Sequence, residues 1–258
     1  MRVKLLSSAH GPLVQYASSY LINDSIAIDA GSLGFWGMPE QQAQVHHIFL
    51  THSHADHIAS LPVFIENVYG LIDPGAMVYA NAYTLNALEQ DVFNDRIWPD
   101  FVELSRLHPP FLSLQELEPE RQVAINGLRI TPVPVHHAVP TFGYIVTDGK
   151  STVVFGADSG PTERIWQLAR EAPAPHTIIL EASFPNSMTD LAKLSAHLTP
   201  ALFADELAKL PDGSRVLTTH IKTRFREEML LELAKVASTA AKNGITVEVA
   251  EADLDYHL

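Results

Sequence analysis

Three histidines and one aspartate fall within six residues of the chain, directly after an apolar segment. The segment 45–50 has the composition of a buried strand, and it is followed by His52, His54, Asp56 and His57. If the chain stays extended, its period of two directs His52 and His54 to the same side, where one metal ion can bind both. A helix that starts near Ile58 would turn Asp56 and His57 toward a second ion. The motif therefore predicts a site for two metal ions.

Three more residues of the same chemical types follow later in the chain. His137, Asp158 and His220 each stand at the end of an apolar run rich in β-branched residues. Open α/β sheets place their ligands at the carboxyl ends of strands, so these side chains are candidates to complete the site. The alternatives are a hydrogen-bonded surface cluster of imidazoles and an adventitious metal site, but neither would require a distant carboxylate and further histidines.

The order of these residues, with Asp29 at the end of the strand-like run Ile26-Ala27-Ile28, resembles the metallo-β-lactamase superfamily. The segments 19–24, 158–161, 181–186, 197–200 and 219–222 are similar to the class II cyclic-nucleotide phosphodiesterases. Two features depart from that class: Ala55 stands where Leu is usual, and the residues after Leu61 follow another pattern. These departures concern the substrate rather than the metal chemistry.

The resemblance implies a ligand for each position of a binuclear centre. One ion would be held by His52, His54 and His137, the other by Asp56, His57 and His220, with Asp158 bridging them. His136 competes with His137, which we favour because a small residue and Val139 follow it. Asp29 would either orient the histidine motif or accept hydrogen bonds from turn amides, and the resemblance favours the first role.

The resemblance also implies an enzyme with Asp56, Glu181 and His197 among its catalytic residues. A hydroxide held between the two ions would attack a 3',5'-cyclic nucleotide such as cAMP or cGMP and give the 5'-nucleotide. His197 would donate a proton to the leaving oxygen or bind the phosphate, and Glu181 would orient it and raise its pKa. The alternative for this pair is a histidine that merely precedes a helix, next to an acidic residue at a strand end.

Two other substrate classes use the same metal ligands. A tRNA 3'-end endonuclease of this superfamily shares the Glu and His elements, but it grips tRNA with an arm inserted between the equivalents of His137 and Asp158. Here little more than two strands and an Asp148-Gly149 turn separate these residues. Hydrolysis of a lactone or a sulfate ester is the third possibility, and Glu181 and His197 argue against it.

The composition narrows the partners. The formal net charge of −13 argues against binding a nucleic acid polymer, which requires a basic face, and favours a small anionic phosphodiester. No cysteine is present, so nitrogen and oxygen must hold the metal, with Zn²⁺ expected and Mn²⁺ or Fe²⁺ as alternatives. No apolar run suits a membrane span, which indicates a cytoplasmic protein. A periplasmic location stays open in case a signal peptide precedes this sequence, and a homodimer stays open as well.

The rhythm of strands and helices predicts the fold class. In each half of the chain strands come first and helices after, which is typical of two mixed sheets flanked by helices, the αββα sandwich that the resemblance implies. A chain of 258 residues suits a single domain over residues 1–258. Thr199 and Pro200 predict a helix start that leaves His197 just outside the helix. For the segment 83–122 we expect helices and a loop.

Overall fold

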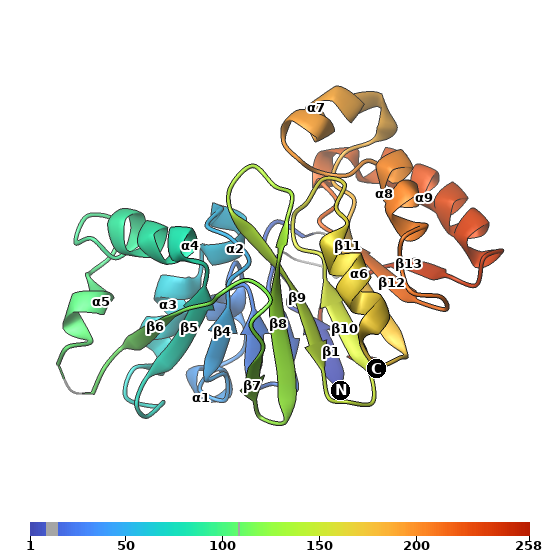
Figure 1. Ribbon diagram of the computed structural model, residues 1–258. Helices are drawn as coiled ribbons and strands as arrows, with labels where there is room; N and C mark the ends of the chain where they lie inside the picture. The colour runs from blue at the N-terminus through green and yellow to red at the C-terminus, as the bar shows by residue number, and fades with distance from the viewer. Residues whose placement is uncertain (9–14, 108) are drawn as a thin grey trace. The chain divides into compact units, whose positions relative to one another are not determined.

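The computed structural model describes residues 1–8, 15–107 and 109–258. Its contacts divide the chain into two compact units. The N-terminal unit comprises Arg2–Glu118 and Ala252–His257, and the C-terminal unit comprises Met1, Pro119–Glu251 and Leu258. Each unit contains one mixed β-sheet with flanking helices, which confirms the predicted fold class (Figure 1). The expectation of a single domain stays a prediction.

The sheet of the N-terminal unit has the order β14-β1-β2-β3-β4-β5-β6. Its strands are β1 (Arg2–Leu5), β2 (Tyr20–Ile22), β3 (Ile26–Ile28), β4 (His47–Phe49), β5 (Ala76–Ala80), β6 (Leu112–Glu116) and β14 (Asp255–His257). Pairing is antiparallel from β14 to β3 and parallel from β3 to β6. The helical segments are η1 (Leu33–Phe35), α1 (Pro39–Gln42), α2 (Ala55–Ile58), α3 (Leu61–Val68), α4 (Ala82–Ala87), η2 (Leu88–Val92) and α5 (Phe101–Leu104).

The sheet of the C-terminal unit has the order β13-β12-β11-β10-β9-β8-β7. Its strands are β7 (Val123–Ile125), β8 (Leu128–Val135), β9 (Thr141–Thr147), β10 (Thr152–Phe155), β11 (His176–Glu181), β12 (Arg215–Thr219) and β13 (Thr246–Val249). Pairing is antiparallel from β7 to β10 and parallel from β10 to β13. The helical segments are α6 (Arg164–Glu171), η3 (Asn186–Met188), α7 (Thr189–Leu194), α8 (Pro200–Leu207), η4 (Thr223–Phe225) and α9 (Arg226–Ala241).

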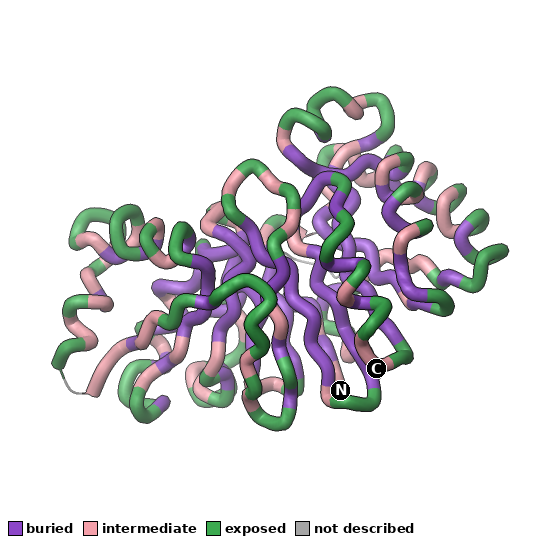
Figure 2. Tube along the Cα trace, viewed as in Figure 1, coloured by how far each residue is buried: buried purple, intermediate pink, exposed green. Residues whose placement is uncertain are grey.

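Each unit buries an apolar core between its sheet and its helices. In the N-terminal unit the stripe Leu61, Phe64, Ile65 and Val68 of α3 joins the core, at the spacing of one helix face. In the C-terminal unit Trp166 of α6, Phe203 of α8 and Met229 of α9 join a core with strand residues such as Ile178. Every residue of β9, β10 and β11 is buried, as Figure 2 shows in purple. Strands buried on both faces have continuous apolar runs rather than an alternating pattern. For this reason the sequence predicts these three strands.

Two local predictions were wrong. The segment 83–122 contains α4, η2 and α5, but also the strand β6, which pairs in parallel with β5 at the edge of the sheet. Only Leu112 is fully buried in β6, so the strand lacks a strong apolar pattern. The first helix after the histidine motif begins at Ala55 rather than near Ile58, so Asp56 and His57 already lie on the helix.

The start of α8 is as predicted. Thr199 is the N-cap, its hydroxyl accepts a hydrogen bond from the Leu202 amide at 3.4 Å, and Pro200 occupies the first turn. His197 therefore stands in the connection that leads into the helix. Among the described residues, no helix is both long and apolar enough to cross a membrane.

Candidate metal centre

The histidine motif of the N-terminal unit lies between the end of β4 and the helix α2. The strand ends at Phe49, so His52 and His54 are not part of it. Their rings still meet edge to face, with centroids 4.5 Å apart, and the rings of His52 and His57 are 4.1 Å apart. His52 and His57 are buried, while His54 and Asp56 are half-buried. His52 and His54 thus come from the segment between β4 and α2, and His57 comes from α2 itself, rather than all from an extended strand.

Backbone contacts hold this loop against the end of β3. The carbonyl oxygen of Asp56 accepts a hydrogen bond from the Ser18 amide at 2.8 Å, and that of His57 accepts one from the Ala30 amide at 2.7 Å. Gly31 lies so close that a Cβ atom at this position would overlap the carbonyl oxygen of Asp56. The Ala30-Gly31 pair after the strand therefore has a packing role: it lets the motif approach the backbone.

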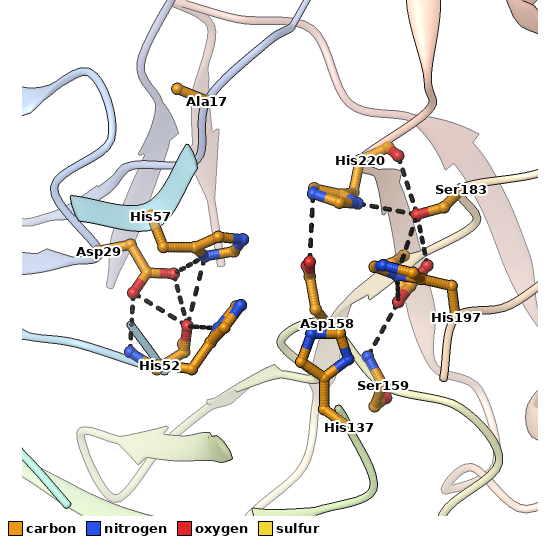
Figure 3. A network of polar contacts seen from close by, with 12 residues as sticks. Ala17, Asp29, His52, His57, His137, Asp158, Ser159, Ser183, His197 and His220 are labelled. Carbon is orange, nitrogen blue, oxygen red and sulfur yellow. Dashed lines mark hydrogen bonds and ion pairs between the residues drawn. The ribbon is translucent and has the colours of Figure 1, made fainter. Parts of the chain in front are cut away.

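Asp29 and Thr51 orient two of the imidazoles. The carboxylate of Asp29 accepts hydrogen bonds from the Thr51 amide at 2.7 Å, from the Thr51 hydroxyl at 2.9 Å, and from Nδ1 of His57 at 2.7 Å (Figure 3). The Thr51 hydroxyl lies 2.9 Å from Nδ1 of His52. Burial raises the pKa of Asp29, and the hydrogen bonds from His57 and Thr51 oppose that rise. With Nδ1 engaged in both rings, Nε2 is the atom that each can present to a metal ion.

The C-terminal unit gathers the remaining candidates from several strand ends. His137 follows β8, Asp158 follows β10, Glu181 ends β11 and His220 follows β12. The ligand atoms of His137, Asp158 and His197 lie within 4.8 Å of one another, as do those of Glu181, His197 and His220. Because parallel strands end at the same edge of a sheet, residues far apart in sequence meet there.

The rings of this second group also have their Nδ1 atoms occupied. Nδ1 of His137 lies 3.1 Å from the backbone carbonyl oxygen of Ala196, to which it donates. Nδ1 of His220 lies 2.8 Å from the Ser183 hydroxyl, and its Nε2 lies 3.3 Å from a carboxylate oxygen of Asp158 (Figure 3). With Nδ1 at the Ser183 hydroxyl, Nε2 is the atom that His220 presents beside the Asp158 carboxylate. A divalent cation fits such a pair, and we conclude that the residues suit a metal ion.

Glu181 and His197 form a close buried pair. Nδ1 of His197 donates to Oε1 of Glu181 at 2.6 Å, and the carboxylate is 1% exposed. Burial tends to lower the pKa of His197, but the hydrogen bond and charge of Glu181, aided by the charge of Asp158, raise it overall. A raised pKa keeps the imidazole protonated to higher pH, which suits a proton donor.

Four residues at or next to the candidate site have left-handed backbone conformations. Asp29 and His220 have φ values of 61° and 59°, and Ala157 and Ala196, which precede Asp158 and His197, have values of 55° and 52°. Such values are uncommon for residues with a Cβ atom and cost about 1 kcal/mol or more each. Asp29, Ala157 and His220 lie just after the ends of β3, β10 and β12, and Ala196 lies between α7 and α8.

The sequence located these residues but gave no role to two hydroxyls. Thr51 immediately precedes the motif, and Ser183 lies two residues after Glu181; both are buried and both contact an imidazole. Their signal is their placement within one or two residues of a candidate ligand or acid. Of the competing imidazoles, His137 is half-buried beside Asp158, whereas His136 is exposed.

Comparison with known proteins identifies the family. Residues 28–221 match the family described as "Beta-lactamase superfamily domain". A probable 3',5'-cyclic-nucleotide phosphodiesterase of Yersinia pestis is 25% identical over 71% of this chain and 59% of its own. The 3',5'-cyclic-nucleotide phosphodiesterase 1 of Saccharomyces cerevisiae is 29% identical over 68% of this chain and 56% of its own. The chain thus spans less than two thirds of the length of these two relatives.

Other relatives are ribonucleases, and solved structures show the same fold. A ribonuclease Z of Methanococcus maripaludis is 24% identical over 83% of each chain. The crystal structure of unliganded yeast PDE1 has a TM-score of 0.81 at 20% identity, covering 100% of this chain and 99% of that one. That of the short form of human tRNase Z has a TM-score of 0.66 at 18% identity, with coverage of 100% and 99%. The resemblance seen in the motifs is confirmed: the chain belongs to the beta-lactamase superfamily.

Proposed function

We propose that this protein is a metal-dependent phosphodiesterase that hydrolyses 3',5'-cyclic nucleotides to 5'-nucleotides. Relatives of two kinds, named cyclic-nucleotide phosphodiesterase and ribonuclease Z, support a metal-dependent hydrolase. Because these two kinds of relatives differ in substrate, their names together do not select a small cyclic substrate. That choice rests on residues of the C-terminal unit.

The metal ligands that we propose are the seven that the motifs single out. One divalent ion would be held by His52, His54 and His137, the other by Asp56, His57 and His220, with Asp158 bridging. Support comes from each unit separately. In four of the histidines Nδ1 lies at a hydrogen-bond partner, which leaves Nε2 as the atom for a metal ion: His52, His57, His137 and His220. Zn²⁺ is our first choice, with Mn²⁺ or Fe²⁺ as alternatives.

The pair of Glu181 and His197 carries the proposal. When bound, divalent ions would activate water and neutralise the negative charge of the phosphodiester. As the bond between phosphorus and the 3' oxygen breaks, that oxygen leaves with the electron pair and requires a proton. We propose that His197 donates it from Nε2; its support is the 2.6 Å contact of its Nδ1 with Glu181 and its raised pKa. The products are a free 3' hydroxyl and a 5'-phosphate.

The segment between His137 and Asp158 favours a small substrate. It consists of β9, β10 and a tight turn, in which the Asp148 carboxylate accepts hydrogen bonds from the amides of Lys150 and Ser151 at 2.9 Å each. No arm that could embrace a tRNA is inserted in this described segment. The net charge of −13 likewise opposes binding to a long polyanion.

The second candidate is a tRNA 3'-processing endonuclease. It is favoured by the ribonuclease Z relative, which this chain covers to 83% of its length, more than it covers of either phosphodiesterase. Both candidates need the same metal ions and the same proton donor. They differ in how the rest of the substrate is held, which is why a substrate comparison separates them.

The test is a hydrolysis panel on one metal-loaded preparation. The panel comprises 3',5'-cyclic AMP, 3',5'-cyclic GMP, 2',3'-cyclic nucleotides, a precursor tRNA, a lactone and an aryl sulfate. We expect the highest kcat/KM for a 3',5'-cyclic nucleotide. A higher kcat/KM for the precursor tRNA, the lactone or the sulfate would overturn the assignment. The variant His176→Ala, which changes a histidine outside the candidate site, should preserve the ranking and serves as the control.

A further inference from the structure

We infer that Ser183 is a positioning residue that links the metal ligand His220 to the pair of Glu181 and His197, so that one carboxylate supports both metal binding and proton donation. The inference rests on the proposed function for the roles of His220 and His197. In the sequence, the one signal of Ser183 is its place two residues after Glu181.

Three distances within the C-terminal unit carry the inference. The Ser183 hydroxyl lies 2.6 Å from Oε2 of Glu181 and 2.8 Å from Nδ1 of His220. The other oxygen of the same carboxylate, Oε1, accepts from Nδ1 of His197 at 2.6 Å. Figure 3 shows Ser183 beside the rings of His197 and His220. The carboxylate thus reaches His197 directly and His220 through one hydroxyl.

The direction of each hydrogen bond follows from the partners. A hydroxyl has one hydrogen to donate, and the negative carboxylate of Glu181 at 2.6 Å is the strongest acceptor within reach. The carbonyl oxygen of His220, at 3.2 Å, is a weaker alternative. With its hydrogen on Glu181, the Ser183 oxygen accepts from Nδ1–H of His220. This places the His220 lone pair on Nε2, the atom that lies beside Asp158.

The backbone keeps Ser183 in this position. Its amide donates to the carbonyl oxygen of Leu198 at 2.9 Å, and its carbonyl oxygen accepts from the amide of Lys222 at 3.3 Å. One residue therefore connects the segment that carries His197 with the segment that carries His220. Ser183 is fully buried, so solvent cannot replace its hydroxyl without rearrangement.

The N-terminal unit contains the same arrangement independently. There the buried carboxylate of Asp29 binds Nδ1 of His57 directly and accepts from the Thr51 hydroxyl, which contacts Nδ1 of His52. Two unrelated stretches of the chain thus combine a carboxylate, a hydroxyl and two imidazoles in one pattern. The recurrence argues that the hydroxyl serves the imidazoles rather than only filling space.

The inference predicts a loss of metal affinity that would not occur if Glu181 and Ser183 oriented His197 alone. Glu181→Gln and Ser183→Ala should both weaken metal binding, because each disturbs the partner of His220. The usual loss for such a supporting contact is about 10-fold to 100-fold in metal affinity. His197→Ala should leave metal affinity unchanged. The double variant that combines Glu181→Gln and Ser183→Ala should lose less metal affinity than the product of the two single losses. Both changes interrupt the same chain of contacts to His220.

The measurement is metal affinity of the metal-free protein without substrate, by competition with a chromophoric chelator for Zn²⁺. Ser183→Thr, which retains a hydroxyl, should restore most of the affinity that Ser183→Ala loses. Ser214→Ala is the matched control, since Ser214 is a buried serine whose hydroxyl bonds only the Pro211 carbonyl oxygen among the contacts of the described residues. Thermal unfolding checks that each variant folds, and if Ser183→Ala does not, the isosteric Glu181→Gln decides.

Unchanged Zn²⁺ affinity in folded Glu181→Gln or Ser183→Ala would overturn the inference, and so would an equal loss in His197→Ala. The proposed function fails by a different observation, which is the wrong substrate ranking in the hydrolysis panel. A protein that prefers precursor tRNA could still show the predicted loss of metal affinity. The two failures are therefore distinguishable.

Discussion

Asp29 in the N-terminal unit and Glu181 in the C-terminal unit have the same pattern of hydrogen bonds, but the histidines that they contact have different proposed roles. Each carboxylate is 1% exposed, each binds the Nδ1 atom of one histidine directly, at 2.7 Å and 2.6 Å, and each reaches a second histidine through a hydroxyl. In the N-terminal unit both histidines are proposed metal ligands. In the C-terminal unit one is a proposed ligand and the other a proposed proton donor.

Under the proposed roles, one arrangement of carboxylate, hydroxyl and imidazoles would serve two kinds of chemistry. The two histidines that Asp29 supports, His52 and His57, lie five residues apart in the chain, so a local motif suffices to place both. The two histidines that Glu181 supports, His197 and His220, are far apart in the sequence, and the pairing of parallel strands brings them together. Losing Asp29 should therefore impair metal binding above all, whereas losing Glu181 should impair metal binding and proton transfer together.

The largest effect is expected for Asp29→Asn. The amide cannot accept from His57 and Thr51 with both of its terminal atoms, so two ligands lose their orientation at once. With about 10-fold to 100-fold per ligand, the combined loss of Zn²⁺ affinity should reach roughly 100-fold to 10,000-fold. Chelator competition measures it, with the exposed Asp91→Asn as control. A loss no larger than that of Glu181→Gln would remove the contrast between the two units.

A second test concerns the proton donor of the C-terminal unit. His197→Ala should keep its metal content and lower kcat roughly 100-fold to 10,000-fold, the usual range for a general acid. A nitrophenyl phosphodiester needs less protonation of its leaving oxygen, so its deficit should be much smaller. An equal deficit for both substrates would make His197 a phosphate-binding residue, and a loss of metal would make it a ligand or a support of the site.

The contrast between the units also explains what the sequence could predict. His52, His54, Asp56 and His57 are legible because they are contiguous, and His137, Asp158 and His220 because each ends an apolar strand. The edge strand β6 was missed because its side chains are only partly buried and its pattern is weak. The roles of Thr51 and Ser183 were missed because a hydroxyl is common in any sequence. Only the folded backbone shows which imidazole it contacts.

Removing the Thr51 hydroxyl should lower Zn²⁺ affinity less than changing the carboxylate that it contacts. Thr51→Val removes the hydroxyl of the N-terminal unit while keeping the shape of the side chain. We expect a loss of Zn²⁺ affinity of about 10-fold, at the lower end of the range for supporting contacts, because Asp29 still binds His57 directly. An affinity equal to that of the unaltered protein would show that the Asp29 contact alone orients the motif.

The smallest effect is expected in the turn between β9 and β10. The amides of Lys150 and Ser151 hold the pKa of Asp148 well below its ordinary value of 3.8, at about 2. A lowered pKa means that the carboxylate stabilises the fold above pH 3.8 and that this contribution disappears as the pH falls through about 2. Because the side chain is partly exposed, the contribution should be only about 1 kcal/mol. Chemical unfolding of the protein and of Asp148→Asn, which cannot titrate, should differ in pH dependence only below about pH 4.

The most direct test of the account is removal and return of metal, with hydrolysis of 3',5'-cyclic AMP as the readout. Exhaustive chelation should abolish hydrolysis, and titration with Zn²⁺ or Mn²⁺ should restore it, with two ions per chain by elemental analysis. Asp158→Ala should retain at least one ion fewer, since a bridging carboxylate also offsets repulsion between the ions. Full hydrolysis of 3',5'-cyclic AMP by the metal-free protein would contradict the account.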